Sequence, residues 1–226
     1  MVLRVHSTCR KVISGVISSY RKGNTMSKSI YLLRHGQTAF NAQQRLQGHC
    51  NSGLTELGKE QASMIGTSIN RKIGNKKHWA VYCSPLGRAI ETAKIVCEEL
   101  GIDSNLITTD ERLKEFNLGD WEKCFIPDLV QNNPKLLSHR DWYLSAPNCE
   151  SYESVVHRIK DFLHDDLIPD HLIVISHGLT GAVLRGVYAA MSYSETFEQD
   201  LPQDAFFLLA DQKISRIQCE VSVEAV

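Results

Sequence analysis

Short apolar runs alternate with stretches of helical periodicity along most of this chain, and this alternation restricts the possible folds more than any other feature. The runs that predict strands span residues 30–33, 79–83, 106–109, 172–175, 205–209 and 214–223. Amphipathic periodicity predicts helices over residues 55–73, 88–100, 151–167 and 180–191. Strands that alternate with helices favour a mostly parallel sheet with helices on both faces, and the two final runs favour an antiparallel edge. The sequence therefore predicts an α/β fold.

The length of 226 residues and the 42% of apolar residues suit one large domain with a sizeable core. Residues 117–147 carry scattered Trp, Pro and His without a clear period, and we interpret them as a cap-like insertion. Residues 1–25 contain several basic residues and no acidic one, whereas Met26 begins a short polar lead into the first strand. We therefore assign the domain to residues 26–226 and treat residues 1–25 as an N-terminal extension, with a mis-assigned start, a disordered tail and a targeting peptide as the alternatives.

Charge and cysteine usage restrict the partners and the compartment. Lys and Arg number 25 against 26 Asp and Glu, so the net charge of −1 predicts neither nucleic acid nor a membrane surface as a partner. The seven Cys form no CxxC pair, which indicates a reducing, cytoplasmic location. No histidine spacing is typical of a metal site, and we expect no metal ion or other cofactor. The oligomeric state stays open, with a homodimer as one option.

Polar side chains follow three of the predicted strands at the point where each strand ends. Arg34 and His35 follow the first strand, Arg88 lies a few residues after the second, and His177 follows the run at 172–175. Ligands of open parallel sheets bind outside the carboxyl ends of the strands. We therefore expect these four side chains to meet in one cationic pocket.

Two imidazoles and two guanidiniums in one pocket suit a phosphate group, because the planar fork of Arg matches phosphate oxygens. A neutral imidazole nitrogen can attack phosphorus and divide a displacement into two easier steps. The charge on the equatorial oxygens then needs fixed cations, which Arg34, Arg88 and His177 could supply without a metal ion. Glu115 lies beside apolar residues and is the candidate proton donor for the leaving alcohol.

The motifs around these residues are spread over almost the whole chain. Residues 33–38 read LRHGQT, with Asn41 six residues after His35. Further matches are Gln47-Gly48, Leu54-Thr55 with Gly58, Gln61-Ala62, Ser84-Pro85-Leu86 with Arg88-Ala89, Thr92-Ala93, Glu115 with Gly119, Trp121 and Glu122, and Ser176-His177-Gly178. As a set they closely resemble the signature of the histidine phosphatase superfamily, to which the cofactor-dependent phosphoglycerate mutases belong.

The resemblance implies a three-layer α/β/α sandwich and a role for each matching residue. By this resemblance His35 is the phosphorylated nucleophile and Glu115 is the proton donor. Arg34, Arg88 and His177 are implied to hold the phosphoryl group. The implied substrate-binding set is completed by Asn41, Gln47, Gly48 and Gly178. The expected partner is a small phosphorylated metabolite.

Within the superfamily the chain looks most like the short branch of phosphatases and mutase-like proteins. The extra segment that longer glycolytic mutases carry before the Glu motif is not found here, which favours hydrolysis of small phosphomonoesters. Phosphoglycerate mutase activity and a non-catalytic phosphate-binding role are the alternatives. Phe40, Lys123 and Cys149 depart from residues that are common in the family, and Lys123 could alter the rim of the pocket.

Residues 53–60 read GLTELGKE, which is a near miss to a nucleotide-binding P-loop. Glu60 occupies the place of the Mg²⁺-binding hydroxyl, and no strand leads directly into Gly53. A nucleotide-binding module is therefore a poor alternative.

Overall fold

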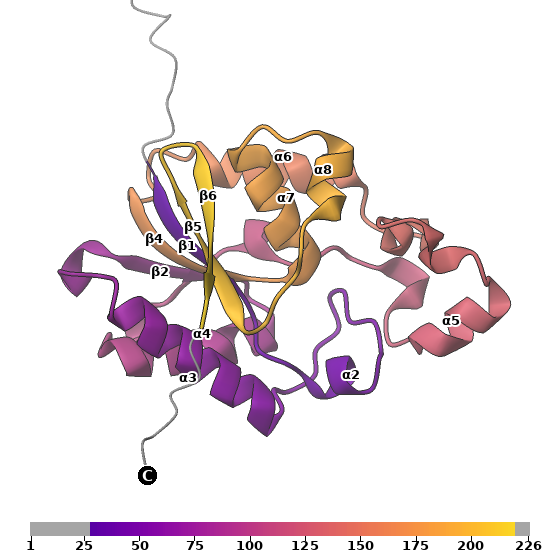
Figure 1. Ribbon diagram of the computed structural model, residues 1–226, viewed down its shortest axis with the longest axis horizontal. Helices are drawn as coiled ribbons and strands as arrows, with labels where there is room; N and C mark the ends of the chain where they lie inside the picture. Colours follow the sequence, from indigo (N-terminus) through magenta and orange to yellow (C-terminus); the bar gives the residue numbers. More distant parts are fainter. Residues whose placement is uncertain (1–27, 220–226) are drawn as a thin grey trace, which may run out of the picture.

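Six strands form one sheet in the computed structural model, which describes residues 28–219 (Figure 1). In spatial order they are β3 (Thr108–Thr109), β2 (Ala80–Cys83), β4 (His171–Ser176), β1 (Ser29–Arg34), β5 (Ala205–Ala210) and β6 (Lys213–Gln218). The first four are parallel, whereas β5 and β6 add an antiparallel edge. The predicted α/β fold with a mostly parallel sheet is confirmed.

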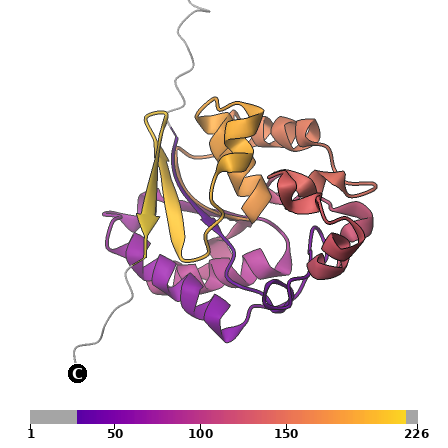
Figure 2. The same cartoon turned by 45° about the vertical axis from the view of Figure 1, so that its right-hand side comes forward.

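Four helices cover the two faces of this sheet, as Figures 1 and 2 show. They are α3 (Glu56–Asn70) and α4 (Gly87–Leu100) on one face, and α6 (Tyr152–Leu163) and α7 (Gly178–Tyr188) on the other. Successive residues of β1 point to opposite layers. Leu33 belongs to the buried cluster that includes Ile65 of α3, whereas Leu32 belongs to the cluster that includes Phe162 of α6. The molecule is therefore a three-layer α/β/α sandwich.

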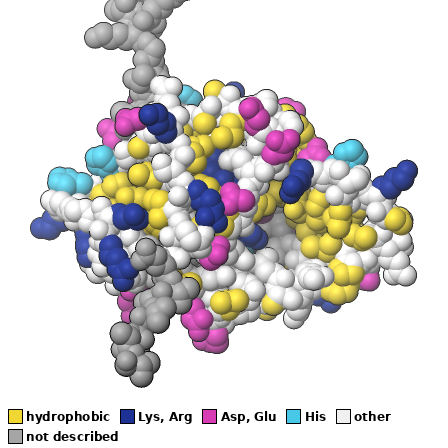
Figure 3. Space-filling model, viewed as in Figure 1, with side chains coloured by type: hydrophobic (Ala, Val, Ile, Leu, Met, Phe, Trp, Pro, Cys, Tyr) yellow, Lys and Arg dark blue, Asp and Glu magenta, His cyan; other side chains and the backbone are white. Residues whose placement is uncertain are grey.

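The stretch 117–147 lies beside the sandwich and contains little regular structure (Figure 1). It holds α5 (Ile126–Asn132) and the short 3₁₀ turns Gly119–Trp121, Leu136–Ser138 and Trp142–Ser145. The rings of Trp121 and Trp142 lie 6.2 Å apart, and Trp142 is buried in the core. Figure 3 shows hydrophobic side chains gathered on the part of the surface around α5. That this stretch acts as a cap stays a prediction.

Several predicted boundaries differ from those of the structure. The third predicted helix, residues 151–167, ends at Leu163 in the structure. Leu167 follows the helical spacing in the sequence, but its side chain is 90% exposed and does not belong to the buried face of the helix. The fourth begins at Gly178, two residues early, because a distant carboxylate, Glu115, accepts hydrogen bonds from its first turn. Helix α8 (Tyr193–Glu198) was not predicted, although its capping box, Ser192 with Glu195, is readable in the sequence.

Two other predictions concern the ends of the chain. The extension 1–25 lies outside the described residues, as does the end of the last predicted strand beyond residue 219. Within residues 28–219, none of the helices combines the length and the apolar character needed to cross a bilayer.

A pair of glycines lets the loop after β1 rest directly on the first turn of α3. A Cβ on Gly36 would lie 2.1 Å from the carbonyl oxygen of Gly58, and a Cβ on Gly58 would lie 2.0 Å from that of Gln37. Thr55 caps α3 by accepting from the N–H of Gly58, and its hydroxyl donates to the side chain of Gln37 at 2.9 Å. Gly58 of the P-loop-like stretch thus serves packing, and its contact with Gly36 and Gln37 fixes the loop that carries His35.

Candidate active site

The carboxyl ends of β1, β2 and β4 meet at one pocket of about 220 Å³. The predicted site residues on its wall are Arg34, His35, Asn41, Gln47, Gly48, Arg88, Glu115 and Gly178. His177 is buried directly behind this wall, and its ring centroid lies 5.2 Å from that of His35. The structure therefore brings every predicted site residue together, with His177 next to the pocket rather than on its surface.

The ring of His35 is held in one orientation and one tautomer. Its Nδ1 lies 2.8 Å from the carbonyl oxygen of Gly36, and because a carbonyl can only accept, Nδ1 carries the proton. The lone pair on Nε2 faces Arg88, whose Nε donates to it at 3.2 Å. Burial, together with the charges of Arg88 and Arg34, lowers the pKa of His35 well below 6.5. The imidazole is therefore neutral near pH 7 and presents an unprotonated nitrogen to the pocket.

Three buried nitrogen atoms next to His35 have no hydrogen-bond partner within the described part of the chain. They are Nε of Arg34 and both ring nitrogens of His177. Arg34 is otherwise anchored, because its NH1 donates to the carbonyl oxygen of Leu201 at 2.7 Å. Burial and the charge of Arg88 lower the pKa of His177 well below 6.5, so this ring keeps one N–H donor when it is neutral. Unpaired buried donors cost about 1–3 kcal/mol each, and an anion bound here would satisfy them.

Arg88 is oriented by a loop that Glu122 holds in place. The buried guanidinium donates from NH1 to the carbonyl oxygen of Cys50 at 2.9 Å and from NH2 to that of Gly48 at 2.8 Å. On the same loop, the N–H groups of His49 and Cys50 donate to separate oxygens of the Glu122 carboxylate at 2.6 and 3.0 Å. The sequence identified Glu122 only as part of a motif. Its contacts give it the role of aligning the two carbonyl groups that fix Arg88.

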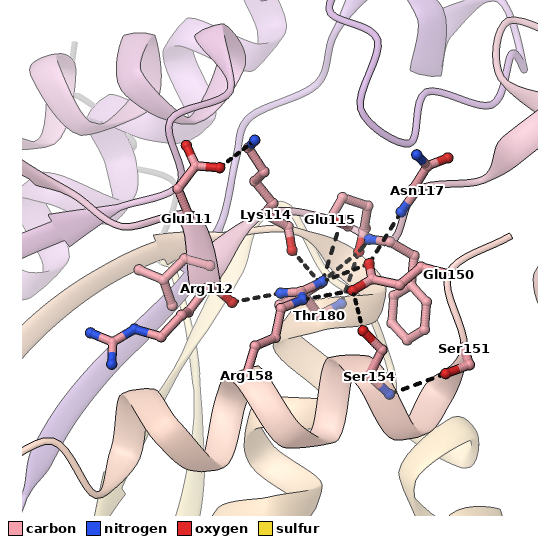
Figure 4. A network of polar contacts seen from close by, with 12 residues as sticks. Glu111, Arg112, Lys114, Glu115, Asn117, Glu150, Ser151, Ser154, Arg158 and Thr180 are labelled. Carbon is pink, nitrogen blue, oxygen red and sulfur yellow. Dashed lines mark hydrogen bonds and ion pairs between the residues drawn. The ribbon is translucent and has the colours of Figure 1, made fainter.

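Glu115 lies at the N-terminus of α7, where its carboxylate joins two elements (Figure 4). Oε1 accepts from the N–H of Thr180 at 2.9 Å, and Oε2 accepts from that of Leu179 at 3.1 Å. Arg158 reaches across from α6, contacts the carbonyl oxygen of Glu115 at 3.4 Å and pairs with Glu150 at 3.1 Å. Oε2 has fewer partners than Oε1, which also contacts the Thr180 hydroxyl at 3.0 Å. Oε2 is therefore the oxygen that a substrate can reach more readily.

The amide side chains of Asn41 and Gln47 are positioned by neighbours of His35. Thr38 donates its N–H to Oδ1 of Asn41 at 3.2 Å, and its hydroxyl accepts from Nε2 of Gln47 at 2.8 Å. Gln203 donates to the carbonyl oxygen of His35 at 3.1 Å and to Oδ1 of Asn41 at 3.3 Å. Gln203 was not predicted from the sequence, because it enters the site from the distant connection before β5 and belongs to no motif.

Cys83, at the end of β2, is a buried residue of the core. Burial raises the pKa of the Cys83 thiol to about 12, so it is a poor nucleophile. Lys123 adopts a left-handed backbone conformation with φ of 68°, a region that favours the glycine common at this position in the family. No group of three or more His, Cys, Asp or Glu side chains within residues 28–219 could hold a metal ion.

Comparison with known proteins defines the class to which this fold and site belong. A family model of the histidine phosphatase superfamily (branch 1) matches residues 30–205. The chain therefore belongs to this superfamily of enzymes, and the resemblance found in the sequence is confirmed.

Individual relatives carry both mutase and phosphatase names. A "Probable phosphoglycerate mutase GpmB" of Salmonella paratyphi C is 39% identical over 173 residues, which are 74% of this chain and 77% of that protein. A "Bifunctional protein" of Mycobacterium tuberculosis is 33% identical over 135 residues, 58% of this chain. The chain spans only 35% of the length of that relative.

Two solved structures share the fold. The alpha-ribazole phosphatase from Shigella flexneri superposes with a TM-score of 0.68 at 24% identity, covering 87% of this chain and all of that chain. A mycobacterial glucosyl-3-phosphoglycerate phosphatase superposes with a TM-score of 0.67 at 23% identity, covering 86% of this chain and 98% of that chain. These TM-scores establish a common fold.

We predict that Glu122→Gln lowers kcat/KM for phosphomonoester hydrolysis about tenfold. A glutamine has one acceptor oxygen and can serve only one of the two loop N–H groups, so the carbonyl groups that hold Arg88 lose their alignment. Steady-state kinetics measure the change. The control is Asp120→Asn, two residues away, whose carboxylate contacts Asn148 on the surface and should leave kcat/KM unchanged. A Glu122→Gln enzyme within twofold of wild type would contradict the role of this loop.

We also predict that the protein loses stability as the pH falls below 6.5. The pKa of His35 and that of His177 are lowered in the folded state, so below this pH the unfolded chain binds protons that the folded chain does not. Each histidine then contributes a slope of up to about 1.4 kcal/mol per pH unit to the free energy of unfolding. Urea unfolding at several pH values should give a shallower slope for His35→Gln. Equal slopes in the two proteins would show that His35 is charged in the folded state.

Proposed function

We infer that this enzyme is a metal-independent phosphatase that hydrolyses small phosphomonoesters through a phosphohistidine on His35. One observation carries the proposal: the buried, neutral ring of His35 donates from Nδ1 to its own loop and leaves Nε2 unprotonated, where it accepts from Nε of Arg88. This is the protonation state that an imidazole nucleophile needs.

In the proposed first step, Nε2 of His35 forms a bond to phosphorus while the bond from phosphorus to the ester oxygen breaks. Arg34, Arg88 and His177 lie around this nitrogen and can stabilise the charge on the three equatorial oxygens. These fixed donors are the reason for proposing that no metal ion takes part. The departing alkoxide accepts a proton from Glu115, for which Oε2 is the better placed atom.

In the proposed second step, water attacks the phosphohistidine and the bond between Nε2 and phosphorus breaks. Glu115, now a carboxylate, accepts the proton that the water loses. Inorganic phosphate leaves, and His35 returns to the neutral tautomer with its proton on Nδ1. Each group thus ends the cycle in the state in which it began.

Transfer to a second hydroxyl instead of water would make the enzyme a phosphoglycerate mutase, and this is the alternative. The 39% identity to a protein with that name favours it. Hydrolysis is the main proposal because the chain lacks the extra segment that longer mutases carry before the Glu motif. We also propose a cytoplasmic location, which the six free cysteines of residues 28–219 support.

We predict that the full chain, treated with EDTA, releases inorganic phosphate from several small monoesters. A screen of phosphorylated metabolites should measure phosphate release and isomer formation in the same samples. His35→Ala should lower turnover at least about 1,000-fold, because the nucleophile is lost. The control His157→Ala removes an exposed histidine on α6 and should leave turnover unchanged. Exclusive interconversion of phosphoglycerates would assign the mutase activity instead, and full turnover by His35→Ala would refute both.

A further inference from the structure

The pocket wall combines the polar groups around His35 with a set of aliphatic side chains. The aliphatic side chains are Leu46, Leu118, Ile126, Leu179 and Leu201. We propose that the enzyme prefers phosphomonoesters with a compact, apolar leaving group over phosphorylated sugars and phosphoglycerates. This inference rests on the proposed phosphatase activity and names its substrate class.

The aliphatic residues are fixed parts of the wall. Leu46, Leu118 and Leu179 are each at least nine-tenths buried, and the small remaining surface contributes to the pocket. Ile126 and Leu201 pack against the same core. Because these side chains are held by packing, they cannot turn away to make room for polar partners.

Three further polar side chains line the pocket, those of Gln44, Arg45 and Tyr143. Gln44 and Arg45 are exposed, and Tyr143 is partly buried. Arg45 donates to the carbonyl oxygen of Lys123 at 3.0 Å and lies over the ring of Phe125, 5.8 Å from its centroid. Arg140 lines a separate depression on the far side of Tyr143. A substrate hydroxyl group that faces the five aliphatic side chains would find no hydrogen-bond partner among them.

A substrate with hydroxyl groups would lose its hydrogen bonds to water on entering this part of the pocket. Each hydroxyl without a new partner weakens binding by on the order of 10- to 100-fold. A carboxylate would lose more, because a buried charge needs a close counter-charge. The guanidiniums of Arg34 and Arg88 already hold backbone carbonyl groups next to His35, and that of Arg45 holds the carbonyl group of Lys123.

The size of the pocket points to a compact substrate. Its volume of about 220 Å³ is below the range of about 300–1,000 Å³ that is typical of small-molecule sites. This space must hold the phosphoryl group as well as the leaving group. A single ring or a short alkyl chain therefore suits it best.

Two esters of matched shape test the preference. Cyclohexylmethyl phosphate and glucose 6-phosphate both carry a six-membered ring on a primary phosphate ester, so their leaving groups are similar and only the first ring lacks hydroxyls. We expect kcat/KM for cyclohexylmethyl phosphate to exceed that for glucose 6-phosphate at least tenfold. The ratio compares two substrates on one preparation, so partial loss of folded protein cancels.

Two variants of α5 assign the effect to the wall. Ile126→Gln places an amide in the pocket and should reduce the ratio at least fivefold, whereas Leu129→Gln, on the same helix, faces a different depression and should leave it unchanged. Equal or faster hydrolysis of glucose 6-phosphate, or of 3-phosphoglycerate, would overturn the proposed substrate class. The proposed phosphatase function would still stand in that case if phenyl phosphate is hydrolysed in a His35-dependent reaction. No hydrolysis of any of these esters would refute both.

Discussion

The hydrogen bond from Nδ1 of His35 to the carbonyl oxygen of Gly36 is the contact on which the chemistry of this protein depends. It fixes the tautomer, and burial among the cationic groups of Arg88 and Arg34 keeps the ring neutral. Without this bond the ring could turn, and either nitrogen could face the pocket. The same surroundings that make the proposed nucleophile neutral would also attract a dianionic phosphoryl group. In the proposed mechanism, one arrangement of charges therefore serves both binding and attack.

The rest of the fold serves to hold that arrangement. The close contact of Gly36 with Gly58 fixes the loop after β1. Glu122 accepts from two N–H groups of the loop whose carbonyl groups fix Arg88. The carboxylate of Glu115, in the loop that follows β3, accepts hydrogen bonds from the N-terminus of α7, next to His177. These contacts are formed between segments far apart in the sequence. The site is thus a property of the packed sandwich and cannot form on any single element.

The sequence predicted the strands and most of the site because those features are local. Residues 30–33 and 172–175 are apolar runs that end at polar residues, and the ends of parallel strands must share one edge of the sheet. The roles of Gln203 and Glu122 could not be predicted, because each depends on a contact across the fold. The predicted start of α7 lies two residues after the observed one for the same reason, because Glu115 accepts hydrogen bonds from its first turn across more than 60 residues of sequence.

Trapping the phosphorylated enzyme tests the central claim most directly. Wild-type enzyme and a labelled monoester should be mixed rapidly, quenched in alkali to preserve phosphohistidine, and mapped by peptide mass and by ³¹P NMR. We predict acid-labile phosphate on Nε2 of His35, formed at least as fast as the ester turns over, and none on the His35→Gln variant. Steady turnover without label on His35, or label on a different residue that forms at the turnover rate, would contradict it.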